Sequence, residues 1–378
     1  MNSKLRLFLI ENAVVILFII LIAFAIPVSE LPAGFLLQEI LMRIGPNAFL
    51  VIALLLPIMA GMGLNFGMVL GAMAGQIGLI FITDWGIVGI PGVLLAMIIS
   101  LPISVFLGWV CGSIMNLAKG REMVTGFILA FFMNGIYMIV VLYAMGSIIP
   151  ILNPELLLSR GYGIRNVVGL DGVRQSLDNL IPLKFNLSFL TPPFVKVPIF
   201  CFVIVALVCL FIVWFRKTKL GQDMRAVGQD RAVADAAGIP VERTRILAII
   251  ISTALAGIGQ VIFLQTMGTI NTTASHEQIG MFSIAALLIG GASVTRASIP
   301  NVLIGVILFH LLFLVSPMAG KNLVGSAQLG EFFRQSVSYG VIAVALVLYE
   351  WKRQTQEHES RADLRGETEP AKKAGGAA

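Results

Sequence analysis

Charged residues are scarce in this chain. Asp, Glu, Lys and Arg together make up 12% of its 378 residues, whereas a quarter is usual for a soluble domain. Apolar residues make up 58%, the mean hydropathy is +0.94, and the apolar residues gather in long runs. Because about 20 apolar residues cross a bilayer as one helix, the sequence excludes an ordinary soluble domain. It predicts an all-α integral membrane protein whose core is built against lipid.

Residues for metal or nucleophilic chemistry are equally few. The three cysteines lie inside apolar runs without a CxxC pair: Cys111, Cys201 and Cys209. The three histidines lack metal-ligand spacing: His276 in a predicted outer loop 268–279, His310 in a span and His358 in the tail. No Ser-His-Asp set or pair of carboxylates stands out. We therefore expect no metal, no cofactor and no enzyme acting alone.

Any energy source of its own is also missing from the sequence. The chain lacks G-x-x-x-x-G-K-[ST], since its only Lys before Ser or Thr is Lys217, which follows Arg216. We also expect no ionisable residue in the middle of a span, which disfavours a proton-coupled carrier. A sodium-coupled carrier that uses backbone carbonyls remains an alternative. A transporter without its own energy source needs a separate ATPase.

The apolar runs predict about ten transmembrane helices in two pseudo-related halves. They lie near 8–27, 45–61, 64–82, 90–117, 123–148, 197–215, 246–267, 280–294, 299–316 and 335–350. Residues 44–83 carry no charge, so we expect the turn near Gly61-Met62-Gly63 to be buried in protein. Together these runs form one transmembrane domain over residues 1–351. A signal peptide ending near Ala23-Phe24-Ala25 is the alternative to an uncleaved first span.

Basic residues predict the orientation. With the N-terminus inside, 18 of the 26 lysines and arginines fall on the cytoplasmic side, as the positive-inside rule requires. The net charge of +6 therefore indicates cytoplasmic loops and not a nucleic-acid partner. Both termini are expected in the cytoplasm. The proline-rich segment 149–196 is the long outer loop, and the charged tail 352–378 is expected to be disordered.

The sequence of one predicted cytoplasmic loop, residues 216–245, contains signals for local secondary structure. It is too charged to cross a bilayer. Asp230 can cap a helix, residues 231–237 are rich in alanine, Gly238 can end the helix in the left-handed conformation, and Pro240 prevents continuation. The pattern predicts a two-turn helix with a face of small residues. Four arginines are expected to flank that face: Arg225, Arg231, Arg243 and Arg245.

Such a helix suits docking against another protein, because small side chains allow close approach and arginines can pair with carboxylates. The alternative is a solvated loop that only keeps positive charge inside. The succession of an N-terminal cap, a short helix and a C-terminal cap favours docking over a solvated loop.

The segment 221–259 resembles the coupling region of permease subunits of bacterial ABC importers, in the family that serves monosaccharides, nucleosides and branched-chain amino acids. The matching residues, which we expect to couple to an ATPase, are Gly221, Arg225, Ala226, Gly228, Ala234, Gly238, Ile239 and Arg243, joined by Asp230 and Arg231. Asp230 stands where the family usually has Asn. The segments 63–78 and 289–305 resemble the family more weakly, and Thr295, Arg296 and Ala297 replace its usual glycines.

This resemblance implies a second permease subunit, identical or related, together with cytoplasmic ATP-binding subunits and an extracytoplasmic solute-binding protein. ATP and Mg would be bound by the ATPase. A sugar or nucleoside is the expected solute, with a branched-chain amino acid as the alternative. An ion-coupled secondary transporter or channel is the competing class.

Uncharged polar residues in or near the spans are candidates for the translocation path: Asn65, Gln76, Asn134 and Gln260. Each of them can instead bond a neighbouring helix. Four glycines spaced by four are expected on one helix face, where they permit close packing: Gly63, Gly67, Gly71 and Gly75. Pore lining is the alternative interpretation of that face.

Overall fold

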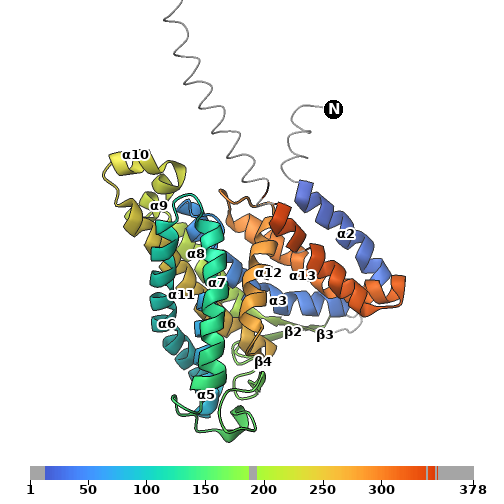
Figure 1. Ribbon diagram of the computed structural model, residues 1–378. Helices are drawn as coiled ribbons and strands as arrows, with labels where there is room; N and C mark the ends of the chain where they lie inside the picture. Colours follow the sequence, from blue (N-terminus) through green and yellow to red (C-terminus); the bar gives the residue numbers. More distant parts are fainter. Residues whose placement is uncertain (1–12, 187–193, 338, 345–346, 348–378) are drawn as a thin grey trace, which may run out of the picture.

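The computed structural model describes residues 13–186, 194–337, 339–344 and 347 (Figure 1). Its helices are α2 (Ala13–Ser29), α3 (Ala33–Ala53), α4 (Leu55–Met59), α5 (Met68–Asp84), α6 (Gly89–Leu117), α7 (Glu122–Ile139), α8 (Ile199–Phe215), α9 (Lys219–Gln229), α10 (Arg231–Ala236), α11 (Val241–Met267), α12 (Ser275–Ile289) and α13 (Ile299–Val324). Residues 327–337 and 339–344 are also helical. The expected tail 352–378 lies outside the described residues.

Short strands occur only between helices in the described part of the chain. β1 (Val167–Gly169) pairs antiparallel with β4 (Thr269–Asn271), and β2 (Pro182–Asn186) pairs antiparallel with β3 (Phe194–Pro198). The predicted outer loop is therefore ordered into two small sheets where it is described. In Figure 1, β4 lies far from α10, so these two elements mark opposite ends of the helix bundle.

Five helices are long and apolar enough to cross a membrane. They are Ala33–Met59, Gly89–Leu117, Glu122–Ala144, Val241–Met267 and Ile299–Val324. A sixth candidate is α8 followed by α9, two helices that meet at an angle of 74°. Helices α2 and α5 are apolar but shorter. The described chain is thus mostly helical with five to six candidate spans, and a helix lies in each of the ten predicted segments.

The core of the bundle forms where α5, α6 and α11 meet, and glycines set the close approach of these helices. A Cβ atom on Gly71 would lie 2.1 Å from the carbonyl oxygen of Thr253, and one on Gly75 would lie 2.6 Å from that of Gly257. On Gly257 itself, a Cβ would lie 2.2 Å from Ser104 Oγ. Small residues allow this separation, which is how helices associate where lipid supplies no hydrophobic drive.

The turn between α4 and α5 confirms one expectation and corrects another. The chain turns through positive φ at Gly61 and Gly63, and Met62 and Gly63 are buried as predicted, whereas Gly61 is exposed. However, Gly63 and Gly67 precede α5, which begins at Met68. The four spaced glycines therefore do not share one helix face, and only Gly71 and Gly75 lie on α5.

The second predicted span is wrong at its start. The span was predicted to begin near residue 45, with Arg43 outside the membrane, but α3 begins at Ala33. The helix tolerates that charge because Glu39 and Arg43 form an ion pair of 3.2 Å one turn apart. The Arg43 guanidinium also lies 5.2 Å from the ring centre of Phe313. This helix is a candidate span that contains ionisable residues.

Candidate functional site

The predicted short helix forms as α10, and both of its caps are confirmed. Asp230 Oδ1 accepts hydrogen bonds from the backbone N–H groups of Ala232 at 2.8 Å and Val233 at 3.0 Å. At the other end Gly238 has φ of +79°, and the N–H of Ile239 donates to the carbonyl of Ala234 at 3.0 Å. This is the Schellman arrangement, in which a left-handed glycine ends the helix. Local sequence alone specifies this element.

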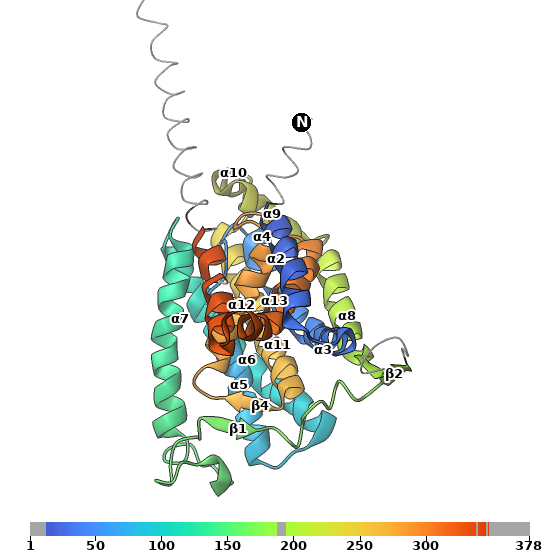
Figure 2. The ribbon, with the colours of Figure 1, turned by 90° about the vertical axis from the view of Figure 1, so that its right-hand side faces the viewer.

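The face that α10 exposes differs from the expected one. Ala234 is buried against Val227 and Val241, so this alanine packs inward and is not open to a partner. The exposed side carries Ala232, Val233, Ala236 and Ala237, and Val233 is 65% exposed. Figure 2 shows α10 at the extreme end of the molecule, beyond α9 and the bundle.

A buried carboxylate ties α10 to the bundle. Glu122 Oε1, at the start of α7, accepts from Arg245 Nη2 at 2.5 Å and from Arg231 Nη1 at 3.3 Å. Arg245, in α11, also donates to Asn116 Oδ1 of α6 at 2.9 Å. Because Arg245 is fully buried, the expectation that it flanks an open docking face is wrong. Its charge is needed inside, where it neutralises Glu122.

Sequence reasoning missed Glu122, although one signal was present. It is the one acidic residue between Asp84 and Glu155. An isolated acid beside a predicted cytoplasmic turn could have been paired with an arginine of the loop 216–245. Which arginine it meets depends on tertiary contacts across more than a hundred residues.

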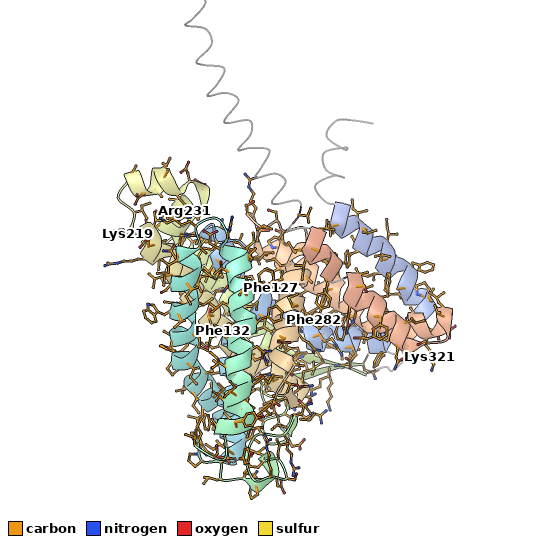
Figure 3. All side chains as sticks on the ribbon, in the orientation of Figure 1. Phe127, Phe132, Lys219, Arg231, Phe282 and Lys321 are labelled. Atoms are coloured by element: carbon orange, nitrogen blue, oxygen red, sulfur yellow. The ribbon has the colours of Figure 1, made fainter. Side chains whose placement is uncertain are left out.

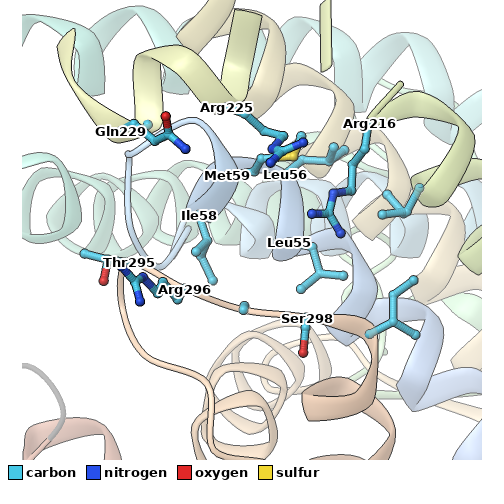
Figure 4. A pocket seen from close by; sticks show the side chains of 14 residues that line it. Leu55, Leu56, Ile58, Met59, Arg216, Arg225, Gln229, Thr295, Arg296 and Ser298 are labelled. Atoms are coloured by element: carbon cyan, nitrogen blue, oxygen red, sulfur yellow. The ribbon is translucent and has the colours of Figure 1, made fainter. Parts of the chain in front are cut away.

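Three exposed arginines gather beside α9 instead. Arg216, Arg225 and Arg296 line a cavity of about 580 Å³, whose apolar side is formed by residues such as Leu55 and Ile58 (Figure 4). None of these three arginines has an ion-pair partner within the described residues. Arg296 comes from the segment that departs from the family pattern. The cavity presents uncompensated positive charge next to α10.

Other expected coupling residues position α9. A Cβ on Gly228 would lie 2.1 Å from the carbonyl oxygen of Met59, and one on Gly221 would lie 2.0 Å from that of Phe215. These glycines let α9 pack on α4 and on the end of α8. Arg243 is exposed at the start of α11. In Figure 3, Lys219 and Arg231 mark this end, whereas Lys321 lies at the far end of α13.

The four candidate path residues do not meet in one place. Asn65 is buried and donates to Ser252 Oγ of α11 at 3.1 Å. Gln260 is also buried, and neither of its side-chain polar atoms has a partner within the described residues. Gln76 and Asn134, in contrast, are joined through His276. That ring places Nδ1 2.9 Å from Gln76 Oε1 and Nε2 2.8 Å from Asn134 Oδ1.

This polar chain continues at both ends. Tyr137 donates to Gln76 Oε1 at 2.8 Å, and Asn134 Nδ2 donates to Glu277 Oε1. His276 and Glu277 were predicted in an outer loop, but they form the first turn of α12 and lie against the middles of α5 and α7. An acid predicted in an outer loop therefore lies beside the candidate span Glu122–Ala144.

Glu277 also lines a second cavity of about 490 Å³ between α5, α7 and α12. Four of its ten lining residues are aromatic: Phe66, Phe127, Phe131 and Tyr339. Of the four candidate path residues, Asn134 touches a wall residue of this cavity directly. Metal binding has no support here, because the described residues contain no group of three or more His, Cys, Asp or Glu that could hold a metal ion.

Comparisons with known proteins agree with this architecture. The chain is 31% identical over 185 residues to a probable ABC transporter permease protein, YphD, of Escherichia coli (strain K12), covering 47% of this chain and 53% of that protein. It is 25% identical over 172 residues to a nucleoside ABC transporter permease protein, NupC, of Lactococcus lactis subsp. cremoris (strain MG1363), covering 45% and 52%. The chain spans about half the length of these two relatives.

One further relative matches over a longer stretch of the chain, at a lower identity than YphD. The autoinducer 2 import system permease protein LsrD of Photorhabdus luminescens is 25% identical over 273 residues, 71% of this chain and 72% of that protein. No solved structure matches the chain significantly. The family described as branched-chain amino acid transport system / permease component matches residues 36–349. Since that match covers most of the sequence, the chain belongs to this family of permease components.

Proposed function

We propose that this chain is one membrane-spanning permease subunit of an ATP-driven importer in a bacterial inner membrane. Residues 1–351 form a transmembrane domain of about ten helices in two pseudo-related halves, and residues 352–378 form a cytoplasmic tail. Both termini lie in the cytoplasm. A second permease subunit, two ATP-binding subunits and an extracytoplasmic solute-binding protein complete the assembly. ATP and Mg are bound by the ATPase, so this chain needs no cofactor.

The observation that carries this proposal is α10. A helix of six residues, capped at both ends, stands beyond the bundle with small side chains outward. It cannot be stable by itself, since isolated helices this short do not form in water. Its caps and its buried Ala234 hold it in a fixed shape, which is what a docking element requires. The adjacent arginine cavity offers positive charge to carboxylates of the ATPase.

Glu122 supplies a mechanism for coupling. When ATP closes the two ATPase subunits, they displace α10, and the bond from Arg231 to Glu122 carries that displacement to the start of α7. The bond from Arg245 to Glu122 carries it to α11. α7 makes few contacts within this chain, since 17% of its most apolar stretch is buried, compared with 56% for α11. Alternating access then follows as α7 moves relative to the core of α5, α6 and α11.

The proposed solute is a sugar or a nucleoside, with a branched-chain amino acid as the alternative. Relatives named for nucleosides and for autoinducer 2 support the first choice. Solute choice rests mainly with the binding protein. Within the permease, Asn134 borders the path through its bond to Glu277, whereas the burial of Asn65, Gln76 and Gln260 favours a role between helices.

Co-purification with the ATPase subunit tests the proposal. Val233→Arg places a long charged side chain on the exposed face of α10, so ATPase binding should fall more than tenfold. Val233 is preferable to Gly238, where any side chain would strain the positive φ and disturb the cap itself. The matched control is Gln222→Arg on exposed α9, which should bind normally. Equal binding by both variants refutes docking through α10.

Glu277 favours one competing function, an ion-coupled secondary transporter, because an acid at membrane depth is typical of ion pathways. Uptake into cells separates the two functions. Uptake that persists after ATP depletion and follows an ion gradient supports the competitor, and uptake that stops with ATP loss supports the importer.

A further inference from the structure

We propose that the cavity between α5, α7 and α12 is an aqueous section of the solute path, with Glu277 as its charge filter. The cavity accepts a neutral ring solute that bears hydroxyl groups, such as a nucleoside, and repels phosphorylated or otherwise anionic solutes. This inference rests on the proposed function as a permease. It adds the location of the solute path, in this cavity, and the residue that selects against anions, Glu277.

The size and lining of the cavity suit such a solute. Its volume of about 490 Å³ falls in the range of small-molecule sites. Phe66 and Phe127 pack edge to face with ring centres 5.2 Å apart, and Phe127 and Phe131 do the same at 4.7 Å. Aromatic rings provide stacking surface for flat bases and apolar sugar faces. Glu277 and Gln278 add oxygen acceptors for hydroxyl groups.

The depth of Glu277 follows from its hydrogen-bond partner. Asn134 lies about 18 Å along α7 from Glu122, at 1.5 Å per residue. The helical segment Glu122–Ala144 has 23 residues and therefore a length of about 34 Å. Glu277, bonded to Asn134, thus lies near the middle of this candidate span. A carboxylate is expensive at that depth unless water or a polar partner reaches it. Asn134 donates to Oε1 of Glu277, and the cavity leaves room for water at the rest of the carboxylate.

The polar chain behind Glu277 fixes its position. Asn134 bonds both Glu277 and His276, and His276 in turn contacts Gln76, which accepts from Tyr137. The two residues at the inner end of this chain, Gln76 and His276, are fully buried. A side chain held in this way keeps one orientation towards the cavity.

The net charge of the cavity wall is negative. Among the ten residues that line it, Glu277 is the only ionisable acid, and none is Lys, Arg or His. In a cleft with low-dielectric walls, one uncompensated carboxylate focuses a field that lowers the local concentration of anions and raises that of cations. Neutral solutes are unaffected by the field and are held by stacking and hydrogen bonds.

Water access can be tested with engineered cysteines and water-soluble thiosulfonate reagents, in membrane vesicles that contain the complete transporter. Phe131→Cys lies on the cavity wall, whereas the matched control Phe132→Cys, next to it on α7, does not line the cavity. Both positions are exposed in the single chain, at 57% and 64%. We expect Phe131→Cys to react at least tenfold faster than Phe132→Cys, after subtraction of the rate for the parent protein. Equal rates overturn the aqueous path.

The charge filter needs a second comparison. A cysteine at Gln278 should react about tenfold faster with a cationic reagent than with an anionic one of similar size. Glu277→Gln, which keeps an oxygen for Asn134, should reduce that ratio to nearly one, whereas Glu242→Gln, an exposed position at the start of α11, should leave it unchanged. No preference in the parent, or a preference that survives Glu277→Gln, overturns the filter. ATPase co-purification reports on the proposed function separately, because it does not depend on this cavity.

Discussion

Replacing Glu122 by Gln tests the link between α10 and the bundle. The substitution keeps the shape of the side chain and removes its charge. Its partner Arg245 is fully buried and has only two acceptors among the described contacts, Glu122 and Asn116. Within the described residues, the Arg245 Nε atom has no hydrogen-bond partner. After the change, a buried cation would be left with neutral acceptors alone.

The expected loss in the free energy of unfolding follows from this geometry. Breaking a buried ion pair on one side costs about 3–5 kcal/mol, because the remaining charge is neither solvated nor paired. The bond from Glu122 to Arg231 is different, since 39% of the Arg231 side chain is exposed and its separation is 3.3 Å. An exposed pair of that kind contributes about 0–1 kcal/mol. Glu122→Gln should therefore destabilise the protein strongly, and Arg231→Gln only slightly.

Two measurements separate stability from coupling. Unfolding by denaturing detergent gives the free energies for Glu122→Gln, Arg231→Gln and the parent. ATP-driven uptake in vesicles, divided by ATP hydrolysis, gives the coupling ratio. Arg231→Gln should fold normally and yet lower the coupling ratio severalfold, because it cuts the bond between α10 and α7. A merely structural role of this bond would leave the ratio unchanged.

A compensated variant makes the test sharper. Glu122→Leu with Arg245→Met replaces the buried pair by apolar groups, a change that is often neutral or stabilising. This double variant should recover stability while transport remains uncoupled. Our reasoning is wrong if Glu122→Gln costs less than about 1 kcal/mol, or if the double variant transports as well as the parent.

Two further substitutions test local and interhelical packing. Asp230→Ala removes the cap of α10, at a cost of about 0.5–2 kcal/mol, and should weaken ATPase affinity severalfold in a titration with the purified subunit. Asp230→Asn, which caps equally well, should retain the affinity; loss with Asn as well would show that the charge matters and the cap does not. Gly71→Val forces a side chain against the carbonyl of Thr253 and should lower stability by about 1–3 kcal/mol in detergent denaturation. Its control is Gly135→Ala on α7, where a Cβ meets nothing within 4 Å, and an equal loss there would contradict close packing of α5 on α11.

The sequence was interpreted wrongly where partners in the folded chain allow charged residues to lie within the helix bundle. Residues 33–44 were predicted between two spans, yet Glu39 and Arg43 pair one turn apart within α3, and Arg43 lies over Phe313 from α13. The loop 268–279, which contains Glu277, was predicted outside the bundle. The bond of Glu277 to Asn134 on a distant helix holds it against the middle of α7. A charge count along the chain contains no information about such partners.

The sequence by itself determined the membrane class, the positions of most helices and the shape of α10. Each of these depends on short-range physics: the apolar length needed to cross lipid, a carboxylate that caps N–H groups two and three residues ahead, and a glycine that adopts positive φ. Only the tertiary structure decided which arginine Glu122 neutralises, which side of α10 is open and where a cavity lies. The first and the last of these join residues more than a hundred positions apart, and all three depend on burial that no local pattern records.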